Sequence, residues 1–219
     1  MKLVSSETSM VVAGAWNAAI VTPEWIQKYG LRQEPNEENR VQVFIPAGSG
    51  MVFEFPRFSF NGLVLAARPD ALVINPKESS QAKMEEIEFL ARNTLAELTH
   101  TPVNGIGHNF EFRDSSPDPR HLGVFTGSQE DLMDAAPNGW EVVGSNVTTS
   151  LRDGDTIVNI ARLFDGTKLT VKFNFHHQIA NRDQAMAVLS GDNGYKRLFQ
   201  NYTIARELVA KMYGEIDDN

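Results

Sequence analysis

The sequence feature that most constrains the fold is a set of short motifs that occur twice in the same order. The segment Ala13–Ile20 aligns with Gly105–Phe112, since both read small residue, any residue, small residue, ring, Asn and then an apolar run. Phe60–Gly62 matches Phe164–Gly166, and both are typical of a turn between two strands. A third match, inside two amphipathic segments, pairs Ala91, Arg92 and Ala96 with Ala205, Arg206 and Ala210. The ordered matches predict one structural unit present twice.

Hydrophobic periodicity predicts a similar series of elements in each half. In the first half these are a strand (Met10–Val21), a short helix after Thr22, four strands (Val41–Ile45, Met51–Phe60, Leu63–Ala67, Leu72–Ile74) and a long helix (Ser79–Leu98). In the second half they are a strand (Pro102–Arg113), a short helix from Ser128, three strands (Trp140–Ser150, Thr156–Phe164, Lys168–Ile179), a short helical or loop insertion (Asn181–Gly191) and a long helix (Tyr195–Tyr213). Hairpin turns between the strands exclude an all-parallel sheet in these stretches.

This order of elements resembles the duplicated TATA-binding-protein-like fold. The resemblance covers nearly the whole chain, as element order alone, and it implies one curved antiparallel sheet with two long helices on one face. We therefore expect an α+β fold, pseudo-duplicated as β-α-β(3-4)-α. The expected organisation is a single compact domain, 1–219, made of repeat one (8–100) and repeat two (101–214). DNA binding is not carried over from the resemblance, because a fold does not define a function.

Charge and composition narrow the functional classes. The net charge of −8 makes nucleic acid an improbable partner, because a negative protein repels phosphate backbones. The chain has no cysteine, which excludes disulfides, thiolate nucleophiles and cysteine zinc sites. The N-terminal residues lack the apolar stretch of a signal peptide, and no apolar run is long enough to cross a bilayer. We therefore expect a soluble, cytoplasmic protein with no membrane contact.

Strand alternation assigns side chains to two faces of the predicted sheet. One face, directed at the helices, receives Leu169, Val171, Phe173, Phe175, His177 and Ile179, together with Ile106, His108, Phe110 and Phe112. The other face, open in this prediction, receives Lys168, Thr170, Lys172, Asn174, His176 and Gln178, together with Asn109, Glu111 and Arg113. By the repeat match, Asn17 lies on the open face and Trp16 in the core.

The open face supplies the candidate site. Glu111, His176 and Lys172 are the candidates for catalysis, because a carboxylate beside an imidazole makes a general base and a nearby lysine stabilises an oxyanion. The alternative is a solvated antiparallel face whose charge pairs only stabilise the sheet. The candidates for binding are Asn17, Asn109, Arg113, Asn174 and His121, the last of these from a proline-containing loop at the rim.

The sequence predicts neither a metal nor a cofactor. His176 and His177 are adjacent in a strand and point in opposite directions, so they do not chelate one ion together. His108 and His177 are expected to be buried and hydrogen-bonded. Gly105 and Gly107 lack the third glycine of a dinucleotide motif and lie within a strand pattern, so they favour a bulge or tight curvature.

Three functions remain from the sequence. The first is a binding or assembly module that uses the concave open face, with a protein, a small molecule or a second copy of the chain as partner. A homodimer through an edge strand such as Val41–Ile45 is one form of this function. The alternatives are a small-molecule enzyme with acid and base residues on that face, and, by fold analogy alone, a nucleic-acid-binding protein. A site, where present, is expected in the second half, with the first half as scaffold.

Overall fold

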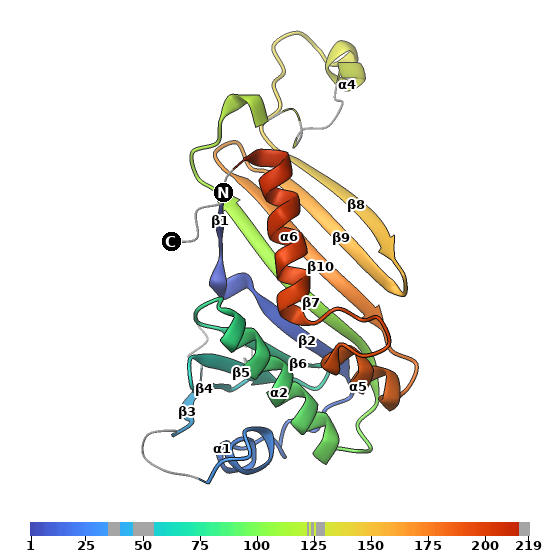
Figure 1. Ribbon diagram of the computed structural model, residues 1–219. Helices are drawn as coiled ribbons and strands as arrows, with labels where there is room; N and C mark the ends of the chain where they lie inside the picture. The colour runs from blue at the N-terminus through green and yellow to red at the C-terminus, as the bar shows by residue number, and fades with distance from the viewer. Residues whose placement is uncertain (35–39, 46–54, 122, 124, 126–129, 215–219) are drawn as a thin grey trace.

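The protein has a mixed α+β fold built on one antiparallel sheet of ten strands (Figure 1). The computed structural model describes residues 1–34, 40–45, 55–121, 123, 125 and 130–214. The strand order is β3-β4-β5-β6-β2-β7-β10-β9-β8, and the short β1 pairs with the C-terminal end of β7. Within the described residues no helix is long and apolar enough to cross a membrane.

The first half of the chain supplies six strands of the sheet. They are β1 (Lys2–Leu3), β2 (Ser9–Gly14), β3 (Gln42–Phe44), β4 (Arg57–Phe60), β5 (Leu63–Ala67) and β6 (Ala71–Pro76). Its helices are α1 (Pro23–Trp25), which continues as a π-helical turn over Ile26–Gly30, and α2 (Gln81–Glu97). As predicted, α1 begins at Thr22, whose hydroxyl accepts a hydrogen bond from the Trp25 amide at 3.2 Å.

The second half supplies the remaining strands and three further described helices. The strands are β7 (Val103–Asp114), β8 (Ser145–Asp153), β9 (Thr156–Phe164) and β10 (Leu169–Gln178). The helices are α4 (Glu130–Ala135), α5 (Arg182–Ser190) and α6 (Leu198–Tyr213). Helices α2, α5 and α6 lie together on one face of the sheet (Figure 1). The helix layer therefore draws on both halves of the chain.

The structure corrects the predicted strand Met10–Val21, since β2 ends at Gly14. The pairing with β7 shifts register between Ala13 and Gly14, where a β-carbon on Gly14 would lie 2.2 Å from the Pro102 carbonyl oxygen. The backbone amides that follow donate hydrogen bonds to loop carbonyls instead of to a strand. The Trp16 amide, for example, donates to the Pro69 carbonyl at 2.9 Å. The close approach of the two backbones and the bulge end the pairing of this segment with β7.

Two other predicted strands start later than expected. The strand predicted from Trp140 begins at Ser145, and Trp140 itself is in a turn with 68% of its surface exposed. The strand predicted from Met51 begins at Arg57, after Pro56, which has no amide hydrogen to donate to a ladder. Residues 46–54, which include the start of that prediction and the turn before it, lie outside the described residues.

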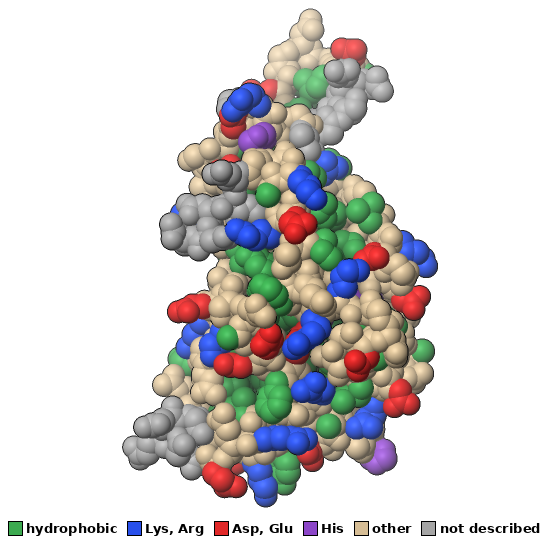
Figure 2. Space-filling model, in the orientation of Figure 1, with side chains coloured by type: hydrophobic (Ala, Val, Ile, Leu, Met, Phe, Trp, Pro, Cys, Tyr) green, Lys and Arg blue, Asp and Glu red, His purple; other side chains and the backbone are tan. Residues whose placement is uncertain are grey.

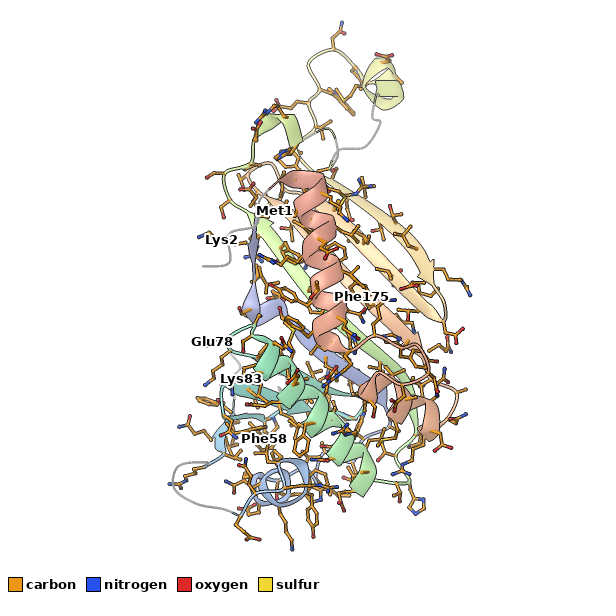
Figure 3. All side chains as sticks on the ribbon, in the orientation of Figure 1. Met1, Lys2, Phe58, Glu78, Lys83 and Phe175 are labelled. Carbon is orange, nitrogen blue, oxygen red and sulfur yellow. The ribbon has the colours of Figure 1, made fainter. Side chains whose placement is uncertain are left out.

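The core forms where aromatic side chains of β7 and β10 meet α6. Phe110 packs edge-on against Phe175 with ring centroids 6.0 Å apart and lies 5.8 Å from Tyr202 of α6. Phe112 makes the same contact with Phe173 at 6.0 Å. Figure 3 shows Phe175 beside α6, above the strands. These contacts confirm the predicted alternation, because the odd-numbered side chains of β10 and the even-numbered side chains of β7 from Ile106 to Phe112 are buried under the helices.

Helix α2 contacts the sheet and α6 through two charged side chains. Lys83 Nζ donates to the Asn61 carbonyl in the β4–β5 turn at 2.6 Å, and Figure 3 shows this side chain at the end of α2 nearest that turn. Glu88, 2% exposed, accepts from the Leu198 amide at the start of α6 at 2.6 Å and from Arg197 Nε at 2.7 Å. A carboxylate on the first turn of a helix satisfies a free amide and complements the helix dipole. Glu88 thus joins the long helices of the two halves.

Burial raises the pKa of the Glu88 carboxyl, and the hydrogen bonds from Leu198 and Arg197 oppose that rise. We predict that Glu88→Ala lowers the free energy of unfolding by about 1–3 kcal/mol, because it leaves the buried Leu198 amide without its acceptor. Urea unfolding followed by circular dichroism measures the change. Glu85→Ala is the control, since Glu85 is exposed on the same helix. Equal losses in the two variants would contradict this role of Glu88.

Candidate functional site

The open face, defined here as the sheet face opposite the helices, carries a ladder of side-chain hydrogen bonds across five strands. Ser150 of β8 donates to Asn159 of β9 at 2.7 Å, and Asn159 donates to Asn174 of β10 at 3.1 Å. Asn174 donates to Asn109 of β7 at 2.8 Å, and Asn109 donates to Ser9 of β2 at 3.1 Å. Each donor and its acceptor are direct cross-strand partners in the backbone register. The pairing of the strands therefore places this row of polar groups.

Glycines beside the ladder give its side chains room. A β-carbon on Gly107 would lie 3.1 Å from Asn174 Nδ2, and one on Gly105 would lie 3.2 Å from His176 Cε1. Both separations are tighter than ordinary van der Waals contact. The sequence analysis assigned these glycines to a bulge or to curvature within a strand, and in the structure they leave space for the amide and the imidazole of β10.

Glu111 lies one side-chain row from the ladder and is held by two cations. Its carboxylate is 4% exposed and forms ion pairs with Lys172 Nζ, at 2.9 Å, and with the Arg113 guanidinium. Lys172 is the direct cross-strand partner of Glu111. A hollow of about 340 Å³ lies over this row and the ladder. Because the carboxylate is buried between two cations, its negative charge is already paired within the protein.

The catalytic candidates are only partly brought together. His176 pairs with Gly107, four residues along β7 from Glu111, which corresponds to about 13 Å of strand. The separation is beyond one hydrogen bond or one bridging water. The structure thus joins Glu111 to Lys172 and places His176 on the other side of the ladder, opposite Gly107 and Ile157, neither of which has a carboxylate to orient the imidazole.

The binding candidates divide in the same way. Asn109, Arg113 and Asn174 share the open face, as predicted from alternation. Asn17 lies beyond the end of β2, where its side chain accepts from the Ala19 amide at 3.2 Å in an exposed turn. His121 lies in a 3-10 turn with its ring edge-on to Tyr213 of α6, 6.0 Å between centroids. Asn17 and His121 are therefore not part of the open-face cluster.

A larger hollow, which we call the β4–β6 hollow, lies on the open face of the first half. Its volume is about 740 Å³. The apolar lining comes from Phe55, Val64, Ala66, Val73 and Pro76, and the charged lining comes from Arg57, Arg68 and Lys77. Among the residues that the structure describes, none of those that line this hollow carries a carboxylate. The sequence analysis expected the first half to be scaffold and did not find this hollow. It did not apply alternation to β5 and β6, where Val64, Ala66 and Val73 alternate with buried neighbours.

Local contacts fix two sides of the β4–β6 hollow. Asn75 donates to the Thr8 carbonyl at 2.9 Å and to the Ser6 carbonyl at 3.3 Å, so the N-terminal segment is tied along its edge. Arg68 makes a two-point hydrogen bond with Asp70, each bond 3.1 Å long. Both of these side chains are largely exposed, so water weakens their pairing. The charged side chains among the described lining residues are all cationic.

A pair of buried histidines lies on the helix side of the sheet. His108 and His177 are 0% and 1% exposed, with ring centroids 5.1 Å apart. Asn201 donates to His108 Nδ1 at 2.8 Å, and His177 Nδ1 is 3.1 Å from the Thr156 hydroxyl. Among the described residues, neither Nε2 atom has a hydrogen-bond partner. The prediction that both histidines are buried and hydrogen-bonded is confirmed.

No metal centre is evident in the described part of the chain, where no three His, Asp or Glu side chains gather closely enough to hold an ion. Comparison with known proteins gives no further assignment: no family model matches the chain, and no curated protein matches it. The candidate site is thus defined by its geometry alone.

The two buried imidazoles predict an acid sensitivity. Burial, reinforced by His177, holds the pKa of His108 well below its usual range, and burial lowers the pKa of His177 to about 4, with smaller effects of His176 and Lys196. Between pH 6.5 and about 4 the unfolded chain binds a proton that the folded chain excludes at His177. The free energy of unfolding should therefore fall as pH falls through this window, by up to about 3 kcal/mol from His177.

Urea unfolding at pH 7 and at pH 5 measures this fall. His177→Gln removes the titrating group and retains a hydrogen-bonding partner for Thr156, so its stability should differ less between the two pH values than that of the parent protein. His100→Gln, at an exposed position, serves as the matched control and should behave like the parent. An unchanged pH dependence in His177→Gln would rule out this assignment.

Proposed function

We propose that the protein is a binding module that uses the open face of its sheet and seats a small ligand in the β4–β6 hollow. The observation that carries the proposal is the hollow itself, whose described lining has an apolar floor, a cationic rim and no carboxylate. Its volume, about 740 Å³, lies within the range typical of small-molecule sites.

The chemistry of the lining selects an amphipathic anion. The floor of Val64, Ala66 and Val73 offers apolar surface to a hydrocarbon or aromatic body. Lys77 is exposed at the rim, where a carboxylate or sulfonate group would meet positive charge. Since the chain as a whole carries a net charge of −8, this local concentration of cations favours an anion at one place on an otherwise repelling protein.

The internal duplication and the curvature of the sheet belong to the same proposal. In support of duplication, β2 and β7 pair at the centre of the sheet, and each is flanked on its other side by the last strand of its own half, β6 or β10. A long helix, α2 or α6, ends each half. A curved sheet of this TATA-binding-protein-like order would make the open face concave and would place both hollows inside the concavity.

The alternative functions receive less support. Glu111 is neutralised by Lys172 and Arg113 and is remote from His176, so an acid–base enzyme on this face would need another arrangement of its groups. Positive and negative side chains are interspersed over the helix-covered face (Figure 2), and the net charge of −8 disfavours a phosphate backbone as partner. A binding role needs neither a rearranged acid–base cluster nor a broad basic surface, and it uses the apolar and cationic side chains already on the open face.

Decanoate and decan-1-ol test the ligand chemistry, because they share an apolar chain and differ in charge. We predict that isothermal titration calorimetry detects decanoate binding and much weaker decanol binding. Ala66→Leu, which fills the floor of the hollow, should weaken decanoate about tenfold or more. Lys77→Gln should weaken it by up to about fivefold, the range of an exposed ion pair.

Ala161→Leu is the matched control, because Ala161 lines the smaller hollow on the same face. It should leave decanoate binding unchanged. Equal affinity for decanoate and decanol would contradict the role of the cationic rim. Loss of binding in Ala161→Leu, with retention in Ala66→Leu, would move the ligand to the other hollow.

A further inference from the structure

Strand β8 forms a long outer edge of the sheet. Its nine residues pair with β9 without a break in register, from Ser145 opposite Phe164 to Asp153 opposite Thr156. Among the described residues no strand pairs with its other side, where the backbone donors and acceptors of an edge strand point outward (Figure 1). The opposite edge of the described sheet, β3, has only three residues. The two edges therefore differ in how much backbone they offer to a partner.

Most of the β8 edge lacks the features by which proteins usually prevent edge pairing. The strand contains no proline and no lysine, its charged residues, Arg152 and Asp153, are the last two, and its register with β9 shows no bulge. Leu151 leaves 48% of its surface exposed on the helix side of the strand. The helix layer gives little cover here, since α6 packs against β7 and β10 rather than β8 (Figure 1). A regular, uncharged middle segment with an exposed leucine is suited to pairing with another strand.

We propose that this strand pairs antiparallel with β8 of a second copy of the chain, with Thr149 on the two-fold axis. In that register Val147 of each copy lies opposite Leu151 of the other, and both side chains belong to the helix side. On the open face Thr148 lies opposite Ser150, and Asn146 lies opposite Arg152, so no like charges face each other. The sequence of β8 is thus complementary to itself.

The self-complementarity also specifies the register. Moving the pairing by one step in either direction places Leu151 opposite Thr149 or Ser145, which separates the two apolar side chains from each other. Only pairing about Thr149 both matches Val147 with Leu151 and uses all nine residues of the strand. An isologous contact of this kind closes after two copies and leaves no further β8 edge exposed.

A cysteine substitution tests the geometry without background, because the chain has no cysteine of its own. On the two-fold axis the two copies of residue 149 face each other at about 4.5–5.5 Å between α-carbons, a separation that suits a disulfide. Thr149→Cys should therefore form a covalent dimer rapidly in oxidised glutathione. Thr148→Cys is the matched control: its two copies are diagonal neighbours, roughly 7–8 Å apart, and should cross-link more slowly.

The mass of the protein in solution gives an independent measurement. Sedimentation of the parent protein should give twice the 24.4 kDa of one chain. Thr149→Lys, at an exposed position, should raise the dimer dissociation constant about tenfold or more, because it sets two like charges opposite each other on the axis. Its circular dichroism spectrum should match that of the parent.

Three results would overturn the proposal. The first is a single-chain mass for the parent at all concentrations, and the second is cross-linking of Thr148→Cys at the same rate as Thr149→Cys. The third is a dimer that Thr149→Lys leaves intact, since that would place the contact elsewhere. The outcome does not depend on the β4–β6 hollow, because β8 and β4 are near opposite ends of the strand order.

Discussion

The pairing of β7 with its neighbours is the constraint on which the rest of the molecule depends. This strand of twelve residues pairs with β2 of the first half and with β10 of the second. Its backbone hydrogen bonds therefore join the two halves of the chain in one sheet. Its alternation sends Phe110 and Phe112 into the core under the helices and sends Asn109 and Glu111 to the open face. A shift of one residue in either register would exchange these faces and bury the charged row.

The polar side chains on the two faces of the sheet are hydrogen-bonded in different ways. On the helix side, buried polar groups are bonded in separate local contacts, as Glu88 is to the start of α6 and His108 is to Asn201. On the open face, polar groups are joined to one another in rows, and Glu111 is enclosed by cations rather than aimed at solvent. The rows of the second half stabilise the sheet, whereas the first half leaves apolar floor uncovered beside its cations. We therefore propose ligand binding at the β4–β6 hollow rather than at the hydrogen-bonded rows of the second half.

Period-two alternation predicted much of this arrangement from the sequence. It placed the long strands β7 and β10 nearly to the residue and gave the correct face for Asn109, Glu111, Lys172 and Asn174. It did not find the end of β2, because apolar residues continue to Val21 and only the approach of Gly14 to Pro102 turns the chain away. It also brought Glu111 and His176 to one face without giving their distance. That distance depends on the register between two strands, which a single strand pattern does not contain.

The hydrogen bonds of the ladder all run in one direction, from the Ser150 hydroxyl toward Ser9. Asn174 accepts from Asn159 and donates to Asn109, so its amide cannot turn over alone without setting like groups face to face at both neighbours. The three asparagines therefore share one orientation, and the serine hydroxyls at the two ends, which can donate or accept, fit it. Five residues from five strands thus behave as one polar unit, with a donating hydroxyl at the β8 end and an accepting hydroxyl at the β2 end.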